Sequence, residues 1–391
     1  MTTVTSINGL RGLSATRDFA PGDAILCDPA LAAVPLDSTS SGAKSAWHVA
    51  AILALQVLKS GIAGALTDLE PKSRLGFIIP DDEKDDYSDA LEGLKTTAAD
   101  ALTVVDADEV ERMLHVVVRN ALQLCGCQAL CVRAAMINHS DRPNATHLGF
   151  ARTADKQLFA CIRAVEPIKA GSMVTISYLA DLATSSEDRR AGLAHHGIEP
   201  EDRPCDAALE GWQAAGVTAR AQLEGPIGAC NVAADSAWQA AESLQNGGGG
   251  GGGGDAAAAA KQRLMEAATH YAKLLQLATG KLDDGHALLL IARARLAKVM
   301  MQSGAQRSQA NALPLWRAVL QATRPCVPAN WPALLEPLRG VAAAAEAAGD
   351  AELAVRHKEE AARVLAVLNP SCSDVRETGR VPDPEETGTT T

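Results

Sequence analysis

The sequence predicts an α+β protein: short strands and a helical insertion form its first part, and helices alone form its second part. Three observations predict this fold class. A strand–turn–strand pattern occurs twice within residues 1–200. Apolar residues recur at helical spacing from about residue 261 onward. Aromatic residues make up only 3% of the chain, so alanine and leucine must fill much of the core, which favours helices over a β-sandwich.

The predicted strands flank two turns that carry proline and glycine. The first turn contains Pro21 and Gly22, and the second contains Pro167 and Gly171. Proline presets φ for a turn, and glycine adopts the left-handed backbone that a tight turn needs. We therefore expect strands on both sides of each turn, at residues 14–17, 24–27, 157–164 and 173–178.

Between these turns the sequence is mostly helical, which predicts an insertion at about residues 40–125 within a β-rich domain over residues 1–200. Residues 47–58 form one apolar run of helical length. A second helix is expected within 95–124, where acidic residues over 106–111 suit a helix N-terminus. The glycine-rich motifs of nucleotide-binding parallel sheets and the GxSxG and HExxH motifs of hydrolases are absent from the sequence.

The second part begins beyond a run of eight glycines at residues 247–254. Polyglycine does not sustain a regular element, so we expect a Gly/Ala linker over residues 247–260. A connecting helical segment precedes it at 201–246, and a domain of helical hairpins follows it at 261–370. The polar, acidic residues 371–391 are expected to form a disordered tail.

The helical domain shows a weak internal repeat. Glycine separates the two helices of each predicted pair, at Gly304 and Gly349, where a helix C-terminus favours it. The repeat is longer than the 34 residues of a tetratricopeptide unit, which it otherwise resembles. The predicted helices lie at residues 286–303, 311–323, 331–348 and 351–368.

Charge and composition restrict the classes of partner. The chain has 36 basic and 47 acidic residues, a net charge of −11, and this balance is unfavourable for binding nucleic acid. It suits basic partners such as lysine-rich tails. No apolar run has the length of a membrane span, and the first residues do not resemble a signal peptide. The nine cysteines are scattered and odd in number, which predicts reduced thiols and a cytoplasmic or nuclear location.

Three segments combine residues that are suited to chemistry. They are Asn8-Gly9-Leu10-Arg11-Gly12-Leu13, Met136-Ile137-Asn138-His139-Ser140-Asp141-Arg142-Pro143-Asn144 and Val174-Thr175-Ile176-Ser177-Tyr178. Each alone is compatible with an ordinary loop or a strand end. Their occurrence together and in this order is the informative signal.

In this order the three segments resemble those of SET-domain protein-lysine methyltransferases, and most closely the SET-and-MYND branch. The run Asp181 to Leu193 continues the resemblance after Tyr178, and Val117 to Leu122 resembles a segment that precedes it. The resemblance implies a β-rich SET domain with a helical insertion, in which the second and third segments form a pseudoknot. An all-α tetratricopeptide-like C-terminal domain would follow.

The resemblance also implies an activity and a site. The expected activity is S-adenosylmethionine-dependent methylation of a lysine in a protein substrate, either a histone or another protein, without direct binding of nucleic acid or membrane. Arg11, Asn120, Asn138, His139 and Tyr178 would border the cofactor, and Tyr178 would be the catalytic tyrosine. These residue types fit, because amide and carbonyl groups can bind both charges of an amino-acid moiety. Methyl transfer in line depends chiefly on positioning.

The sequence departs from the branch at its zinc sites and at one aromatic residue. Residues 36–47, where the MYND finger would begin, contain no cysteine, and residues 197–205 contain only Cys205. Asp141 stands at the position of another zinc ligand, so we expect no bound metal. The second aromatic residue of the family falls at His196, or at Gly197 with Ile198.

Other residues with possible functions are expected to be structural. We interpret Cys125, Cys127 and Cys131 as buried thiols. The pair Arg189-Arg190 is expected on a solvated helix face. A non-catalytic protein that binds partners through its helical hairpins is the alternative to an enzyme, and a tetratricopeptide co-chaperone is a third hypothesis, which leaves residues 1–200 unexplained.

Overall fold

The computed structural model describes residues 2–7, 10–36, 46–60, 63–66, 69, 79, 83–98, 107–152, 157–179, 181–211, 217–246, 253–302 and 305–368. The chain divides into two compact units. The first comprises Met1–Tyr178, Gly192–Glu199 and Val367–Thr391, and the second comprises Leu179–Ala191 and Pro200–Ala366. Each unit is described separately below.

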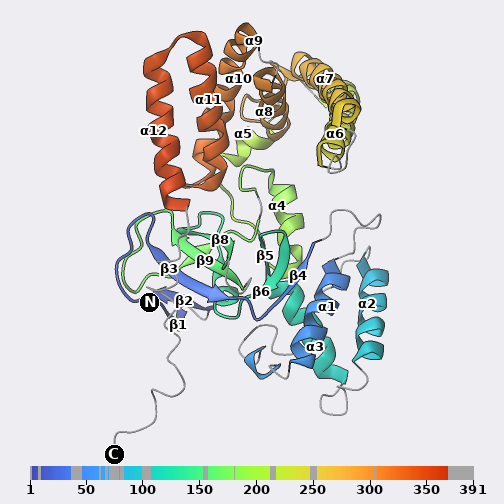
Figure 1. Cartoon of the computed structure of the whole chain (residues 1–391), viewed down its shortest axis with the longest axis vertical. Helices are drawn as coiled ribbons and strands as arrows, with labels where there is room; N and C mark the ends of the chain where they lie inside the picture. The colour runs from blue at the N-terminus through green and yellow to red at the C-terminus, as the bar shows by residue number, and fades with distance from the viewer. Residues whose placement is uncertain are drawn as a thin grey trace, which may run out of the picture. The chain divides into compact units, whose positions relative to one another are not determined.

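Small sheets build the first unit (Figure 1). Three of them are antiparallel: a hairpin of β1 and β2, a sheet with the order β3-β9-β8 and a sheet with the order β4-β6-β5. The fourth joins β7 and β10 in parallel. The strands are β1 (Thr2–Ile7), β2 (Leu10–Ala15), β3 (Ala24–Pro29), β4 (Ala32–Pro35), β5 (Ala121–Leu124), β6 (Cys127–Leu130), β7 (Asn138–His139), β8 (Ala145–Ala151), β9 (Leu158–Ala164) and β10 (Thr175–Ile176).

The two predicted turns are present, and they lie beside each other. Gly22 has φ of +95° and Gly171 has φ of +82°, the left-handed conformation that glycine tolerates best. The backbones of Phe19 and Ile168 exchange two hydrogen bonds of 2.8 and 2.9 Å, which join the loops that contain the turns. The strand that precedes the first turn is β2, which spans Leu10–Ala15. It therefore begins and ends earlier than the predicted strand at residues 14–17.

The predicted helical insertion separates β4 from β5. It contains α1 (Ala46–Lys59), η1 (Ala63–Leu66), α2 (Lys84–Thr97) and α3 (Ala107–Asn120). Leu53 of α1 and Met113 of α3 are completely buried in a core that the three long helices share. Alanine, leucine and valine form much of this core, as the low aromatic content requires.

Helices build the second unit. The elements after β10 are α4 (Ser186–Leu193), η4 (Ala194–His196), α5 (Asp206–Glu210), α6 (Val217–Asn246), α7 (Gly253–Ala278), α8 (Ala287–Gln302), α9 (Gln306–Asn311), α10 (Leu313–Thr323), η5 (Arg324–Cys326), η6 (Pro332–Leu334), α11 (Leu335–Ala348) and α12 (Ala351–Leu368). Of these, η4 belongs to the first unit. Gly349 separates α11 from α12 with φ of +82°, as predicted, whereas Gly304 lies outside the described residues.

The predicted linker is wrong over residues 253–260, because α7 begins at Gly253. Ala256 to Ala260 are strong helix formers, and Ala260 is buried, so packing and propensity together extend the helix towards the glycines. The remaining glycines of the run, residues 247–252, lie outside the described residues, as does the predicted tail 371–391.

The glycines connect α6 to α7, which pack against each other. We expect that doubling residues 247–252 by inserting six further glycines lowers the free energy of unfolding by only about 0.6 kcal/mol, because closure entropy grows slowly with loop length. Urea unfolding of both proteins measures this difference. A loss several times larger would contradict a purely connecting role.

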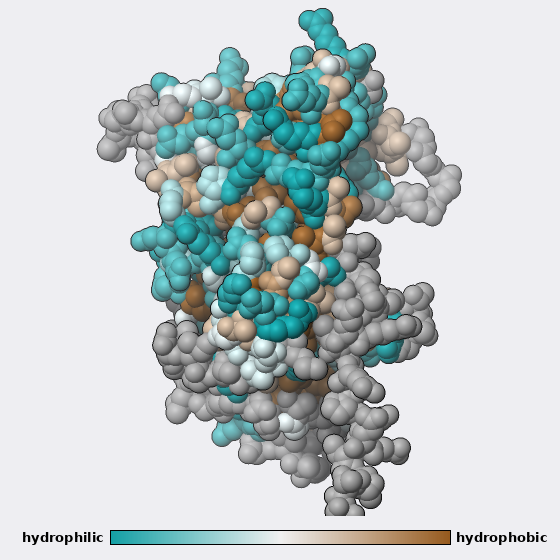
Figure 2. All heavy atoms as spheres, turned by 90° about the vertical axis from the view of Figure 1, so that its left-hand side faces the viewer, coloured by the Kyte–Doolittle hydropathy of each residue, from teal (hydrophilic) through white to brown (hydrophobic). Residues whose placement is uncertain are grey.

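The surface of the described residues is mixed in character. Figure 2 shows polar side chains over much of one face, with apolar ones between them. The large apolar residues that are most exposed lie apart in the sequence: Val232, Met265, Ile291, Val355 and Leu365. None of the helices formed by described residues is long and apolar enough to cross a membrane.

Candidate functional site

The parallel pairing of β7 with β10 forms the centre of the candidate site. Asn138 lies opposite Thr175, and His139 lies opposite Ile176. The backbone N–H of Ser140 then donates to the carbonyl of Ile176 over 3.0 Å. Two segments separated by more than thirty residues are thereby held side by side. The family resemblance of the sequence implied this contact between the segments around Asn138 and Tyr178.

Asn144 locks these two segments together. Its side-chain amide donates to the carbonyl of Met173 over 2.9 Å, and its side-chain oxygen accepts from the N–H of Thr175 over 2.9 Å. One asparagine side chain therefore substitutes for two strand hydrogen bonds. The Pro-Asn end of the motif around His139 is consequently structural.

Tyr178 lies directly after β10 and makes two hydrogen bonds to the segment around β7. Its N–H donates to Nδ1 of His139 over 3.1 Å, and its hydroxyl donates to the carbonyl of Ile137 over 2.7 Å. Burial raises the pKa of Tyr178 to about 12. The phenol therefore stays protonated at neutral pH.

His139 has its ring orientation set by this contact. Because Nδ1 accepts a hydrogen bond, the neutral imidazole carries its proton on Nε2. Nε2 lies 3.8 Å from Oδ1 of Asp141, and both side chains are almost fully buried. The ring centroids of His139 and Tyr178 are 5.4 Å apart. The predicted pair of His139 and Tyr178 is thus one packed unit.

Arg11 and Asn138 meet at Gly12. The side-chain amide of Asn138 donates to the carbonyl of Arg11 over 3.0 Å. A Cβ at Gly12 would lie 2.6 Å from Nδ2 of Asn138 and 2.2 Å from Cε of Met173, so any larger residue would have to displace these side chains. Close packing therefore explains the glycine at position 12. The contact with Asn138 also places Arg11 beside the paired segments that contain His139 and Tyr178. Gly9 lies outside the described residues.

Asn120 is the last residue of α3. Its side-chain amide donates to the carbonyl of Val116, one turn earlier, over 2.7 Å. This bond caps the C-terminus of the helix immediately before β5. A role for Asn120 beside a cofactor stays a prediction.

His196 packs against Tyr178, the residue that the sequence predicts to be catalytic. It is the last residue of η4, and its ring centroid lies 4.6 Å from that of Tyr178. The sequence left the second aromatic position open between His196 and the pair Gly197–Ile198. Of these residues, His196 alone has a ring that can pack on Tyr178. Spacing along the chain did not distinguish them, because the contact of the His196 ring with Tyr178 joins residues that are eighteen positions apart.

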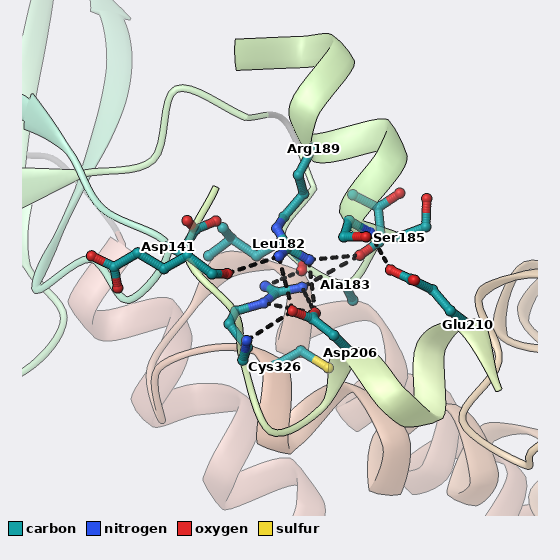
Figure 3. A network of polar contacts seen from close by, with 12 residues as sticks. Asp141, Leu182, Ala183, Ser185, Arg189, Asp206, Glu210 and Cys326 are labelled. Carbon is teal, nitrogen blue, oxygen red and sulfur yellow. Dashed lines mark hydrogen bonds and ion pairs between the residues drawn. The ribbon is translucent and has the colours of Figure 1, made fainter. Parts of the chain in front are cut away.

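The second unit contains a network of two arginines around one carboxylate (Figure 3). Asp206 accepts from Arg189 over 2.8 and 3.0 Å and from Arg203 over 3.0 and 3.1 Å. Arg189 also donates to the carbonyl of Glu201, and Arg203 donates to that of Leu182. The network ties together three stretches of the segment 182–206 that follow the candidate site in the sequence.

The expectation that Arg189 lies on a solvated face is wrong. Arg189 is completely buried, whereas Arg190 is exposed. Burial of a guanidinium requires a counter-ion, and that counter-ion is Asp206, which lies seventeen residues later. The residues next to Arg189 in the sequence therefore gave no indication that its side chain is buried.

The three thiols considered together in the sequence differ in environment. Cys131 is buried, and this burial raises its pKa to about 12. Cys125 and Cys127 are not buried, because they flank the turn between β5 and β6, where Cys125 has φ of +50° and Gly126 has φ of +74°. The prediction of buried thiols is therefore correct for Cys131 only.

No group of three or more His, Cys, Asp or Glu side chains within the described ranges is placed to hold a metal ion. We expect purified protein to contain far less than one zinc ion per chain, because a tetrahedral zinc site needs four protein ligands. Elemental analysis after gel filtration measures this ratio. One or more tightly held zinc ions per chain would contradict the prediction.

Comparison with known proteins agrees with this fold. Residues 10–179, the part of the chain that contains the small sheets and the helical insertion, match the family described as the SET domain. A largely helical region follows it. No curated protein matches the chain.

The chain also has distant similarity to solved structures. One is the SET domain of LSMT bound to lysine and AdoHcy, with 14% identity, a TM-score of 0.32, and coverage of 98% of this chain and 92% of that chain. Another is Rubisco LSMT bound to AdoMet, with 14% identity, a TM-score of 0.33, and coverage of 98% and 93%.

Proposed function

We propose that the protein is an S-adenosylmethionine-dependent protein-lysine N-methyltransferase of the cytoplasm or nucleus. The observation that carries the proposal is the parallel pairing of β7 with β10 in a segment that matches the SET domain. This pairing joins Asn138, His139 and Tyr178 in one hydrogen-bonded unit. The substrate would be a lysine side chain of a protein, in a histone or in another protein.

The residues near Gly12 fit the amino-acid end of the cofactor. Nδ2 of Asn138 is engaged by the carbonyl of Arg11, which leaves Oδ1 available to accept from an ammonium group. The guanidinium of Arg11 is a suitable partner for a carboxylate. The amide oxygen of Asn138 and the guanidinium of Arg11 would thus be partners for the ammonium and the carboxylate of a zwitterion.

S-adenosylmethionine, when bound, would supply the methyl group from its sulfonium. The role of the protein in such a displacement is to align the acceptor amine, and alignment can account for much of the rate. The ordinary pKa of a lysine is about 10.4, so the amine must lose a proton before it can accept a methyl group. An apolar wall and a nearby cation both lower that pKa.

Tyr178 and His196 would form part of that wall. Their rings are in contact, and the phenol of Tyr178 is held protonated with its hydroxyl fixed by Ile137. A fixed, neutral hydroxyl can orient the lone pair of an amine without removing its proton. In this proposal, Tyr178 is the catalytic residue and His196 bounds the site.

Two successive measurements test the proposal. Calorimetry with S-adenosylhomocysteine should show binding of one molecule per chain. Incubation with radiolabelled S-adenosylmethionine and a lysate should then label protein on lysine, as detected by amino-acid analysis. Binding without labelling would favour the alternative of a non-catalytic interaction protein, and no binding at all would refute the cofactor assignment.

A further inference from the structure

Two cysteines that have no part in the proposed methyl-transfer site lie opposite each other in the first unit. Cys27 of β3 and Cys161 of β9 are directly paired in the antiparallel register. The thiol of Cys27 donates a hydrogen bond to the sulfur of Cys161 over 3.2 Å. The two residues are 2% and 0% exposed. The fold therefore brings together two buried thiols that are 134 positions apart in the sequence.

The backbone at this pair has the spacing that a disulfide needs. The α-carbons of directly opposite residues in an antiparallel sheet are about 4.5 or 5.5 Å apart. Both separations fall within the range of about 4.4 to 6.8 Å that disulfides span. To form the bond, the two sulfurs must approach from 3.2 Å to about 2.0 Å. Small movements of the side chains supply this approach, and β3 and β9 keep their register.

A third buried thiol of the first unit is not placed to compete. Burial, and then the charge of Asp28, raise the pKa of Cys131 to about 12, so the thiol of Cys131 lies near that carboxylate. Successive side chains of a strand point to opposite faces of the sheet, so Asp28 and Cys27 lie on different faces. Cys131 is therefore on the face away from the pair.

The edge of the sheet gives access to the buried pair. The sheet has the order β3-β9-β8, so β3 is its edge strand. The register of β3 with β9 shifts between Ala24 and Leu26, immediately before Cys27. Such an irregularity interrupts the ladder of hydrogen bonds, and weakly held segments open locally without global unfolding. Transient opening of β3 would expose both thiols to a small solute.

We propose that Cys27 and Cys161 form a modification site for oxidants of the peroxide class, which convert the pair into a reversible disulfide between β3 and β9. One thiol attacks hydrogen peroxide as its thiolate, and the O–O bond breaks. The sulfur becomes a sulfenic acid, and the released hydroxide takes the thiol proton to become water. The second thiol then attacks the sulfenic sulfur, so the S–S bond forms, the S–O bond breaks and a second water leaves.

The two sulfurs supply the two electrons that reduce the peroxide. A dithiol such as dithiothreitol reverses the reaction by thiol–disulfide exchange. In a reducing compartment the disulfide would therefore be transient, as is usual for redox-sensing pairs. This inference does not depend on methyl transfer.

The bond would fix the strand that anchors the segment before β7. Asp28, next to Cys27, accepts hydrogen bonds from the backbone N–H groups of Arg133 and Ala134 over 2.7 and 2.9 Å. Ala134 begins η3, which leads to Asn138. A covalent link between β3 and β9 opposes the opening of β3, and with it the release of this anchor. Oxidation therefore makes local opening rarer in the part of the unit that supports the candidate site.

The first test uses the full-length protein with all its cysteines. Reduced protein is treated with a small excess of hydrogen peroxide, free thiols are blocked with N-ethylmaleimide in denaturant, and the non-reduced peptides are analysed by mass spectrometry. We expect a peptide that joins Cys27 to Cys161 and that dithiothreitol cleaves. The bond must be mapped rather than inferred from a thiol count, because Cys205 and Cys326 are also hydrogen-bonded to each other in the second unit.

Three outcomes of this mapping would overturn the proposal. The first is that both thiols stay free to react with N-ethylmaleimide. The second is oxidation of either cysteine to a sulfinic acid without a disulfide. The third is a bond from either cysteine to a different one.

Thermal unfolding gives a second readout. A disulfide that closes so long a loop restricts the unfolded chain, so oxidation should raise the Tm of the first unit by roughly 10 °C, and dithiothreitol should reverse the increase. Cys161→Ala and Cys27→Ala should each abolish the increase. Cys131→Ala is the matched control, because it removes a buried thiol of the same unit and leaves the pair intact. An equal increase in Cys161→Ala and in the wild type would refute the role of the pair.

Hydrogen exchange tests the effect on the anchor. The amide protons of Arg133 and Ala134 should exchange about tenfold more slowly in the oxidised protein, because their release requires β3 to open. The amide protons of α1, which packs in the separate core of the insertion, serve as the control and should be unaffected. Equal exchange of Arg133 and Ala134 in the two forms would contradict the coupling of β3 to η3.

Discussion

Replacing Tyr178 by phenylalanine should reduce methyl transfer roughly 30- to 1000-fold, which corresponds to a loss of about 2–4 kcal/mol in the transition state. Phenylalanine keeps the ring that packs on His139 and His196 but removes the hydroxyl that would orient the amine. The affinity for S-adenosylhomocysteine should change little. Single-turnover assays with radiolabelled cofactor measure the rate, and calorimetry measures the affinity.

The hydroxyl also has a structural partner, so stability must be measured beside activity. Removing it leaves the carbonyl of Ile137 without the 2.7 Å hydrogen bond from Tyr178, at a cost of about 1–3 kcal/mol if that carbonyl stays buried. Assays at a temperature well below both unfolding transitions separate this loss from the catalytic one. Tyr271→Phe is a matched control for the loss of a buried phenol in the second unit, where Asp235 accepts its hydrogen bond.

Asn138→Ala should chiefly weaken cofactor binding, whereas Tyr178→Phe should chiefly slow methyl transfer. The substitution removes both the bond to the carbonyl of Arg11 and the oxygen that would accept from the cofactor. A wild-type protein that methylates a lysine, combined with an equally active Tyr178→Phe variant, would contradict the role of Tyr178. Unchanged cofactor affinity in Asn138→Ala would contradict the role of Asn138.

Replacing Asp206 by asparagine should destabilise the second unit by about 3–5 kcal/mol, the usual consequence of leaving buried charges without their partner. The side chains of Arg189 and Arg203 are only 1% and 2% exposed, and Asp206 is the carboxylate that pairs with both. Asparagine keeps the shape of the side chain but not its charge. Thermal and urea unfolding measure the loss, and Asp202→Asn, at an exposed position of the same segment, is the control.

The carboxylate of Asp206 should also make the stability of the second unit depend on pH. Burial alone would raise the pKa of Asp206, but the hydrogen bonds from Arg189 and Arg203 and the charge of Arg203 outweigh it and hold the pKa below its usual value of 3.8. Its stabilisation is therefore fully present above about pH 4 and is lost as pH falls through the lowered pKa. The difference in stability between wild type and Asp206→Asn should shrink in acid. A difference that is constant down to pH 2 would contradict this account.

Local patterns were sufficient for a large part of the fold. Pro21 with Gly22 and Pro167 with Gly171 identify turns that the structure contains, because proline and glycine restrict the backbone through their own covalent geometry. The apolar periodicity identifies the helices of the insertion and of the C-terminal region for a similar reason, since one face of each must be buried. The residues around Asn138 and Tyr178 indicate a joined site through their motif, and the pairing of β7 with β10 agrees with it.

The sequence by itself thus determined the fold class, the positions of most elements and the segments that meet at the site. Tertiary structure alone decided that Arg189 is buried, that the ring of His196 faces Tyr178 and that the helix α7 extends back to Gly253. Each of these depends on a partner distant in the sequence or on how the chain turns in space. Periodicity and motifs report the neighbours of a residue along the chain, whereas burial, charge pairing and ring contacts depend on neighbours that only folding supplies.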